Sequence, residues 1–207
     1  QVPEKRTPEA FALAARAFAE LAAYIDDLSK GAAHRPLRLL PLYEALASEL
    51  GRPVDPVDLY YVDLSRKPPP RDTASVRTAS EDMRVIARTA RARYQRGFLR
   101  WLKSDPVGAE EMRAAVADVE LAQGVSTQRP FWWSALGFLD ALNARAIPPA
   151  LDARRLVTRI EQQLKSLSEG SPSISERLMR EVLFFVAHAT AAKGIVDQVK
   201  QTYGLAD

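Results

Sequence analysis

The sequence predicts an all-α fold of about eight helices packed as antiparallel bundles. Apolar residues recur at three- and four-residue spacing along most of the chain, and no useful stretch alternates with the period of two typical of a strand. Glycines and prolines stand at the intervals expected for helix ends. The 207 residues are 47% hydrophobic and 27% charged, an average globular composition that rules out wholesale disorder.

The N-terminal part predicts two helices followed by a short extended segment. Thr7 can cap the first helix, and Gly31 ends it. A second apolar repeat ends at Gly51. The string at 59–62, Leu-Tyr-Tyr-Val, is too short for a helix and indicates an extended segment docked on the bundle. We therefore expect residues 1–64 to form one helical unit.

Residues 65–79 predict a linker. The segment is charged and contains three consecutive prolines at 68–70, which favour polyproline II over a packed element. We expect a second helical bundle over residues 80–207.

Six further helices are predicted in this second bundle. Ser80 offers an N-cap for the first of them, and Ser173 with Glu176 forms a capping box ahead of the fifth. The helix over 131–142 is apolar nearly all round, which is typical of a helix surrounded by others. The expected helices run from Ser80 to about Lys103, from Pro106 to Gly124, from Phe131 to Leu142, from Pro149 to Gly170, from Ser173 through Val186, and from Ile195 to Tyr203.

Composition argues against an active site in this chain. There is no cysteine, which excludes disulfides, thiolate metal sites and cysteine nucleophiles. The two histidines, His34 and His188, are 154 positions apart and form no local pair for a metal. The nine glycines match no phosphate-cradling spacing, and neither G-x-S-x-G nor H-E-x-x-H occurs. We predict no catalytic residue, no cofactor and no metal, and an enzyme is the least favoured function.

The charge pattern does not predict a nucleic-acid partner. The net charge of +3 is too small to argue for one. Six arginines on the helix after residue 80 divide between the two flanks of its apolar stripe, whereas a nucleic-acid helix would pool them. We expect their stems to cover the core edges and their heads to meet acidic neighbours. These residues are Arg84, Arg88, Arg91, Arg93, Arg96 and Arg100.

The sequence shows neither a membrane-spanning segment nor a signal segment, and this predicts where in the cell the chain is located. No apolar stretch approaches the roughly 18 residues of a membrane span, and no signal segment opens the chain. We expect a cytoplasmic domain without a membrane partner. The chain begins at Gln1 rather than at methionine, which predicts a piece excised from a longer protein.

Consecutive aromatic and acidic residues suggest sites that helical geometry disfavours. Phe131-Trp132-Trp133 would present a flat stacking platform only if the three rings shared one face, but neighbours on a helix point about 100° apart. We expect core or interface packing for them. The carboxylate pairs at 26–27 and 110–111 diverge in the same way and are predicted to be solvated rather than catalytic.

The residues that follow each histidine bear on whether it could accept a phosphoryl group. The usual acceptor pattern is a histidine with lysine at +3 and glycine at +4, whereas Lys193 and Gly194 follow His188 at +5 and +6. On a helix the +5 position points about 140° away from the histidine. His34 precedes Pro36 by two residues, which predicts a loop or a first turn. Structural or solvated histidines are the preferred interpretation, and His188 stays open as an acceptor.

Three stretches of the chain resemble a known family. They are similar to the N-terminal region of the chemosensory-pilus hybrid histidine kinases of the ChpA/PilL type. The similarity spans nearly the whole chain at the level of motifs. The stretches are Leu39–Leu46 with Gly51 and Asp58–Leu64, Gln128–Trp133 with Gly137–Leu142, and Glu169–Ser173 with Glu176–Glu181 and Phe184–Ala187.

The resemblance implies a histidine-phosphotransfer-like segment without an acceptor. These kinases carry several such domains ahead of a kinase core and a receiver, and they control type IV pilus extension and twitching motility. Their phosphotransfer domains are four-helix bundles with the acceptor in mid-helix. The corresponding helix here would be 127–145, and the position four before Gly137 is Trp133. FimL, a stand-alone protein similar to this kinase region, works by binding, and the resemblance implies the same here.

The resemblance further implies protein partners. A polar-localisation protein, a response regulator or other domains of the same kinase are expected, and the cell pole is a candidate location. A homodimer is left open. Two alternatives also stay open: an active phosphotransfer domain that uses His188, and a stand-alone helical adaptor.

Overall fold

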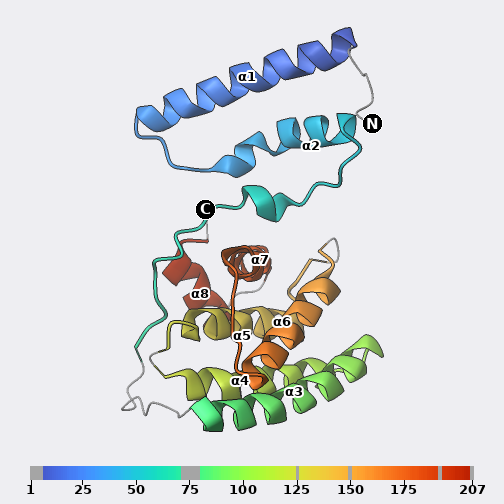
Figure 1. Cartoon of the computed structure of the whole chain (residues 1–207), viewed down its shortest axis with the longest axis vertical. Coiled ribbons are helices and arrows are strands. Elements are labelled where there is room, and N and C mark those ends of the chain that lie inside the picture. Colours follow the sequence, from blue (N-terminus) through green and yellow to red (C-terminus); the bar gives the residue numbers. More distant parts are fainter. Residues whose placement is uncertain (1–6, 71–79, 125, 149–150, 191–192, 206–207) are drawn as a thin grey trace. The chain divides into compact units, whose positions relative to one another are not determined.

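The computed structural model describes residues 7–70, 80–124, 126–148, 151–190 and 193–205, and it confirms the all-α prediction. Within these ranges the chain forms eight α-helices, two short 3-10 helices and no strand (Figure 1). The chain divides into two compact units, residues 1–61 and 62–207. The boundaries predicted from the sequence remain predictions, and residues 71–79 of the expected linker lie outside the described ranges.

The first unit is a helical hairpin with a small core. It contains α1 (Pro8–Ser29), the 3-10 helix η1 (Pro36–Leu39), α2 (Leu40–Glu49) and the 3-10 helix η2 (Pro56–Leu59). Thr7 caps α1 as predicted, because its Oγ1 accepts a hydrogen bond from the Ala10 N–H at 3.2 Å. The described part of the unit buries only five apolar side chains, which are Ala17, Tyr24, Leu42, Ala47 and Val57.

The second unit is built around one central helix. Its members are α3 (Ser80–Leu102), α4 (Val107–Gln123), α5 (Arg129–Asn143), α6 (Ala153–Ser168), α7 (Glu176–Ala187) and α8 (Ile195–Tyr203). Eleven of the 15 residues of α5 are buried, as its all-round apolar sequence predicted. The helix packs against α4, α7 and α8, while α3 packs against α4 and α6 (Figure 1).

Helices α3 and α4 approach each other closely because a glycine stands on each side of the contact. A Cβ placed on Gly97 would lie 2.7 Å from the carbonyl oxygen of Gly108, and one placed on Gly108 would lie 2.3 Å from the backbone nitrogen of Trp101. Both separations are well below van der Waals contact, so neither position has room for a side chain. Sequence spacing alone does not show this function of the two glycines.

Two predicted helix starts differ from those found. Helix α6 begins at Ala153, where Asp152 Oδ1 accepts from the Arg154 N–H at 3.1 Å, whereas the predicted start, Pro149, lies outside the described residues. Helix α7 begins at Glu176, capped by Ser175 and not by Ser173. The Oγ of Ser175 accepts from the Leu178 N–H at 3.2 Å, so the helix starts two residues later and no capping box forms.

The arginines of α3 largely meet acidic neighbours, as their division between two flanks predicted. Arg91 contacts Glu161 of α6 at 2.7 Å, and Arg100 contacts Asp105 at 2.7 Å and Glu111 at 2.8 Å. Arg93 and Arg84 also lie beside carboxylates. The arginines therefore tie α3 to α4 and α6.

A buried tyrosine completes the contact between α3 and α6. Tyr94 is fully buried, and its hydroxyl donates a hydrogen bond to the carbonyl of Val157 at 3.0 Å. Burial, with a smaller contribution from the nearby Glu161 carboxylate, holds the pKa of Tyr94 well above its usual value.

Candidate functional site

The position expected to carry a phosphoryl acceptor lies in the core of the second unit. Trp133 is 4% exposed, and its ring centroid lies 6.4 Å from that of Tyr203 in α8. One turn further along α5, a Cβ on Gly137 would lie 3.1 Å from Cγ2 of Val199, also in α8. Helix α8 therefore covers the face of α5 on which both residues stand. No partner protein can reach this face while α8 is in place.

Helix α8 is firmly attached. Val196, Val199 and Tyr203 are at most 3% exposed. Lys200 Nζ donates a hydrogen bond to the carbonyl of Ala189 at 2.8 Å, which joins α8 to the segment after α7. Burial raises the pKa of Tyr203, and the nearby Ser134 side chain partly opposes that shift.

His188 lies at the C-terminal end of α7 and is exposed. Its Nδ1 is 2.8 Å from the carbonyl oxygen of Phe184, and its ring centroid is 4.2 Å from the Phe184 ring. Because a carbonyl only accepts, Nδ1 carries the proton in this contact, and the lone pair of the imidazole is then on Nε2. The structure places this histidine at a helix end and not in the middle of a helix.

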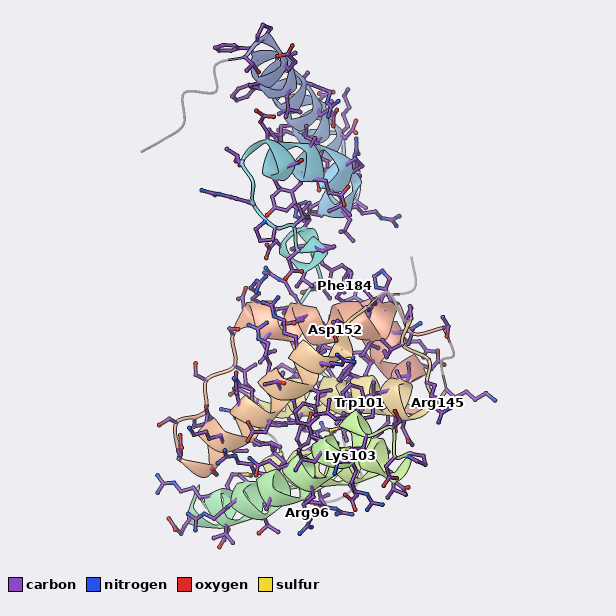
Figure 2. All side chains as sticks on the ribbon, turned by 90° about the vertical axis from the view of Figure 1, so that its right-hand side faces the viewer. Arg96, Trp101, Lys103, Arg145, Asp152 and Phe184 are labelled. Carbon is purple, nitrogen blue, oxygen red and sulfur yellow. The ribbon has the colours of Figure 1, made fainter. Side chains whose placement is uncertain are left out.

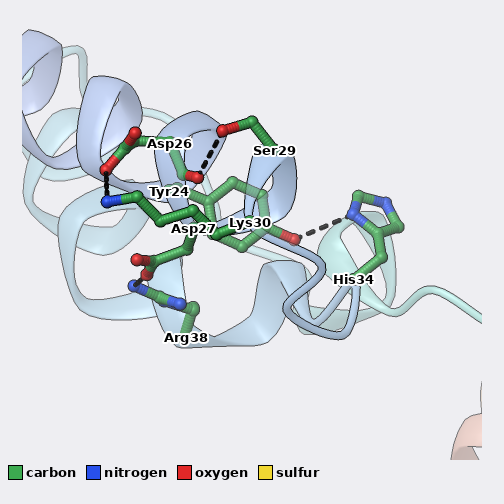
Figure 3. A network of polar contacts seen from close by, with 7 residues as sticks. All are labelled: Tyr24, Asp26, Asp27, Ser29, Lys30, His34 and Arg38. Carbon is green, nitrogen blue, oxygen red and sulfur yellow. Dashed lines mark hydrogen bonds and ion pairs between the residues drawn. The ribbon is translucent and has the colours of Figure 1, made fainter.

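His34 takes part in a structural network of the first unit. It lies in the connection between α1 and η1, where the hydroxyl of Tyr24 is 2.9 Å from its Nδ1 (Figure 3). Tyr61 approaches the imidazole edge-on at a centroid distance of 4.4 Å. Arg38 lies over the Tyr24 ring and contacts Asp27 at 2.6 Å. These contacts join the end of α1 to the start of η1 and give His34 a packing function.

The other candidate residues separate as predicted. Phe131, Trp132 and Trp133 are all buried in α5. Asp26 pairs with Lys30, whereas its neighbour Asp27 pairs with Arg38, so the two carboxylates do not act together (Figure 3).

The same divergence holds for the second carboxylate pair. Glu111 binds Arg100, while Glu110 is exposed. Across the described ranges, no three His, Asp or Glu side chains are grouped so that they would hold a metal ion. Nor does any helix in those ranges have the length and apolar character needed to cross a membrane.

The sequence interpretation missed an open depression beside Trp101. It lies where the C-terminal end of α3 meets the chain leading into α6, and its volume is about 390 Å³. Its floor is mainly apolar, and Trp101 is half-buried in it. The lining residues are Trp101, Leu142, Ile147, Pro148, Leu151, Asp152, Ala153 and Arg154.

Cations without acidic partners gather on this side of the second unit. Arg154 belongs to the lining, Lys103 follows Trp101 by two residues, and Arg145 precedes Ile147 of the lining by two. Trp101, Lys103 and Arg145 are labelled in Figure 2. All three cations are exposed, and none has an ion pair within the described part of the chain. An apolar hollow with a half-buried tryptophan and a cationic rim suits an acidic protein segment that carries an apolar anchor. Periodicity predicts that Trp101 faces the core, but it cannot show that chain from residues 142–154 builds a hollow next to it.

Comparison with known proteins relates this chain to a scaffold protein. A similar protein is the scaffold protein FimL of Pseudomonas aeruginosa, which is 24% identical over 209 residues. The alignment covers 99% of this chain and 37% of that protein, so the chain spans a little over a third of the length of its relative. No solved structure matches.

A family match covers most of the second unit. Residues 79–207 match the family described as the FimL scaffold protein second domain. This match takes in all six helices of that unit, including the α8 that covers Trp133. Since it extends over well more than half of the 207 residues, the chain belongs to the FimL scaffold protein second-domain family.

Proposed function

We propose that this chain is a non-catalytic scaffold segment, phosphotransfer-like in origin, that binds proteins of a chemosensory system controlling type IV pili and twitching motility. The observation that carries the proposal is the burial of Trp133 and Gly137 beneath α8. A phosphotransfer domain must present its acceptor to a partner, whereas here the corresponding face is apolar and covered.

The similarity to a protein named as a scaffold supports this proposal. The chain is a cytoplasmic segment recruited to the cell pole, and its partners are a polar-localisation protein, a response regulator or domains of a chemosensory kinase. A stand-alone scaffold and a segment of a hybrid kinase are both compatible with such docking. The stand-alone scaffold and the kinase segment would bind the same partners.

The second candidate function is phosphoryl transfer by His188, which its exposure favours. The lone pair on Nε2 would form a bond to phosphorus while the bond from phosphorus to the donor breaks, and Phe184 would hold the protonated Nδ1. The nearest sequence match to the acceptor's lysine is Lys193, five positions on, beyond the end of α7. Helical spacing therefore does not hold this lysine beside the imidazole.

A phosphotransfer assay separates the two functions. The chain is incubated with a chemosensory kinase core and labelled ATP, beside an intact phosphotransfer domain as the positive control and His188→Gln as the matched variant. We expect no acid-labile label on the chain while the positive control is labelled. Label on the wild type that His188→Gln abolishes would overturn the scaffold proposal.

The depression beside Trp101 is the docking surface that we assign to this scaffold. The observation favouring it is an apolar hollow with Arg154 in its lining and Arg145 two residues before Ile147 of the lining, neither of them ion-paired within the described residues. The one carboxylate of the lining, Asp152, caps α6 by accepting from the Arg154 N–H. An acidic segment would meet these cations, and an apolar side chain within it would contact Trp101. Such a site would bind more weakly as the salt concentration rises, because its rim contacts are screened.

We expect Trp101→Ala to weaken partner binding about tenfold or more, since a half-buried aromatic anchor contributes at least that much at a typical interface hot spot. Binding of a purified response regulator and of a polar-localisation protein is measured by calorimetry. Leu121→Ala, at an exposed apolar position near the far end of α4, is the matched control and should leave binding unchanged. Equal affinity of Trp101→Ala and wild type, with equal helical content, would exclude this surface.

A further inference from the structure

The outer face of α1 is apolar and uncovered. Ala17 and Tyr24 are buried on the inner face, whereas Phe11, Phe18 and Ile25 are 64%, 74% and 64% exposed. Contiguous exposed apolar surface of this kind is typical of an interface and not of a solvated helix. We therefore expect another protein surface to cover this face of α1.

The exposed residues follow the spacing of a coiled-coil seam. Positions 11, 15, 18, 22 and 25 are separated by four, three, four and three residues, which is the a/d pattern of two heptads. All five are exposed. Their sizes alternate strictly between large and small: Phe11, Ala15, Phe18, Ala22 and Ile25.

This alternation complements itself when two copies of α1 run antiparallel. In antiparallel pairing an a position faces a d position of the other helix, so Phe18 faces Ala22 of the second copy and Ile25 faces its Ala15. Phe18 and Ile25 of each copy then enter the spaces left by alanines of the other, and Phe11 faces Ser29, the next position of the same pattern. Parallel pairing would instead place phenylalanine against phenylalanine and alanine against alanine, leaving crowded and empty layers.

Charges on α1 neither oppose this pairing nor suit a charged partner. The positions flanking the seam include Ala12, Ala19 and Leu21, so no like charges meet. Asp26, beside Ile25, is the charged residue that flanks the seam, and it pairs with Lys30. Arg16 and Glu20 lie off the seam and pair with each other at 3.4 Å. An apolar face without charges selects its partner by shape complementarity. The surface complementary to this face is the same face of a second copy.

The exposed area and the small core agree with a second copy as the covering partner. At roughly 150–250 Å² per aromatic side chain, this face exposes on the order of 600 Å², close to the roughly 800 Å² that each partner contributes to a standard interface. Within the described part of the first unit only five apolar side chains are buried, and a hairpin of about 60 residues with so little core gains stability from a partner.

We propose that two copies of this chain associate through the seam of α1 (Phe11, Ala15, Phe18, Ala22 and Ile25), with the two helices antiparallel. Each α2 remains on the inner face of its own α1, so the association forms a four-helix assembly. The proposal goes beyond the scaffold function and does not depend on it, because it uses only the first unit. A dimer would present two copies of the second unit, and so two sets of docking surfaces, to partner proteins.

Sedimentation of the whole chain tests the association. We expect a concentration-dependent dimer for the wild type and a dissociation constant at least tenfold higher for Phe18→Glu, because a carboxylate would be buried in the seam. Ala15→Glu should act alike, and Leu99→Glu, at a 61% exposed position of α3, should not. A wild type that sediments as a monomer up to about 100 µM, or a dimer unaffected by Phe18→Glu, would overturn the proposal.

Cross-linking tests the relative orientation of the two α1 helices. Because the sequence contains no cysteine, a single introduced cysteine would be the only thiol in each copy. In the antiparallel arrangement the two Ala19 positions lie beside each other near the two-fold axis, whereas the two Ala12 positions are about 24 Å apart along the direction of the helices. We expect Ala19→Cys to form an interchain disulfide under mild oxidation and Ala12→Cys to form none. Cross-linking of Ala12→Cys as efficient as that of Ala19→Cys would contradict the antiparallel seam.

Discussion

Gly108→Ala is expected to lower the free energy of unfolding of the second unit by about 2 kcal/mol, although alanine is the better helix former. The new Cβ would lie 2.3 Å from the backbone nitrogen of Trp101, so two helix backbones must move apart. Overpacking against backbone costs roughly 1–3 kcal/mol and occasionally more, while the gain in helix propensity returns only about 1 kcal/mol. Urea unfolding followed by tryptophan fluorescence measures this unit, because all three tryptophans belong to it.

Gly137→Ala is the matched control, because it adds the same methyl group to a helical glycine of the same unit. Its Cβ would meet Cγ2 of Val199 at 3.1 Å, and a side chain can shift where a backbone cannot. We expect a loss well below that of Gly108→Ala. If Gly108→Ala unfolded at the same urea concentration as the wild type, the close approach of α3 and α4 would be wrong.

Glu120→Ala is expected to destabilise the second unit by about 3–5 kcal/mol. Glu120 is 1% exposed, and its Oε1 lies 3.0 Å from Nε of Arg129, whose side chain is 12% exposed. Removing the carboxylate leaves an arginine in a poorly hydrated site without this counter-charge. Burial already lowers the pKa of Arg129, which shows that its charge is costly there. The same fluorescence-monitored urea titration measures the loss.

Two further variants identify the cause of that loss. Glu176→Ala removes a carboxylate that is 77% exposed and pairs with Arg180, so the expected change is below about 1 kcal/mol. The double variant Glu120→Met/Arg129→Met removes both charges and should be markedly more stable than Glu120→Ala. A double variant as unstable as the single one would point to lost packing instead of an uncompensated charge.

Helix positions and core residues could be predicted because they depend on local spacing. The apolar period placed α1 to within two residues, and the all-round apolar stretch at 131–142 identified the central helix. The start of α6 was misplaced because proline at 149 suits a first turn, but the hydrogen bond that begins the helix comes from Asp152. Which of two nearby residues begins a helix depends on the path of the chain before it, and this path is set by tertiary contacts.

The candidate sites were less predictable because they depend on contacts between distant residues. The resemblance predicts that Trp133 stands at the acceptor position, but the contact of Trp133 with Tyr203 joins positions 70 residues apart. The depression beside Trp101 likewise needs residues 142–154 to return to the end of α3. The seam of α1 was visible only in part, since the same apolar period describes its inner and its outer face.

The contacts of residues 62–70 matter for how the second unit is cut out and expressed. Arg66 Nη1 donates to the carbonyl of Thr202 at 3.1 Å, and Arg129 Nη2 donates to the carbonyl of Pro69 at 3.0 Å. Val62 is 7% exposed, and Pro68 is buried as well. A recombinant fragment trimmed to the family boundary at residue 79 would discard these contacts and leave Arg129 one acceptor short. The natural edge of the second unit is therefore residue 62, its first residue, and not the point at which the helical pattern resumes.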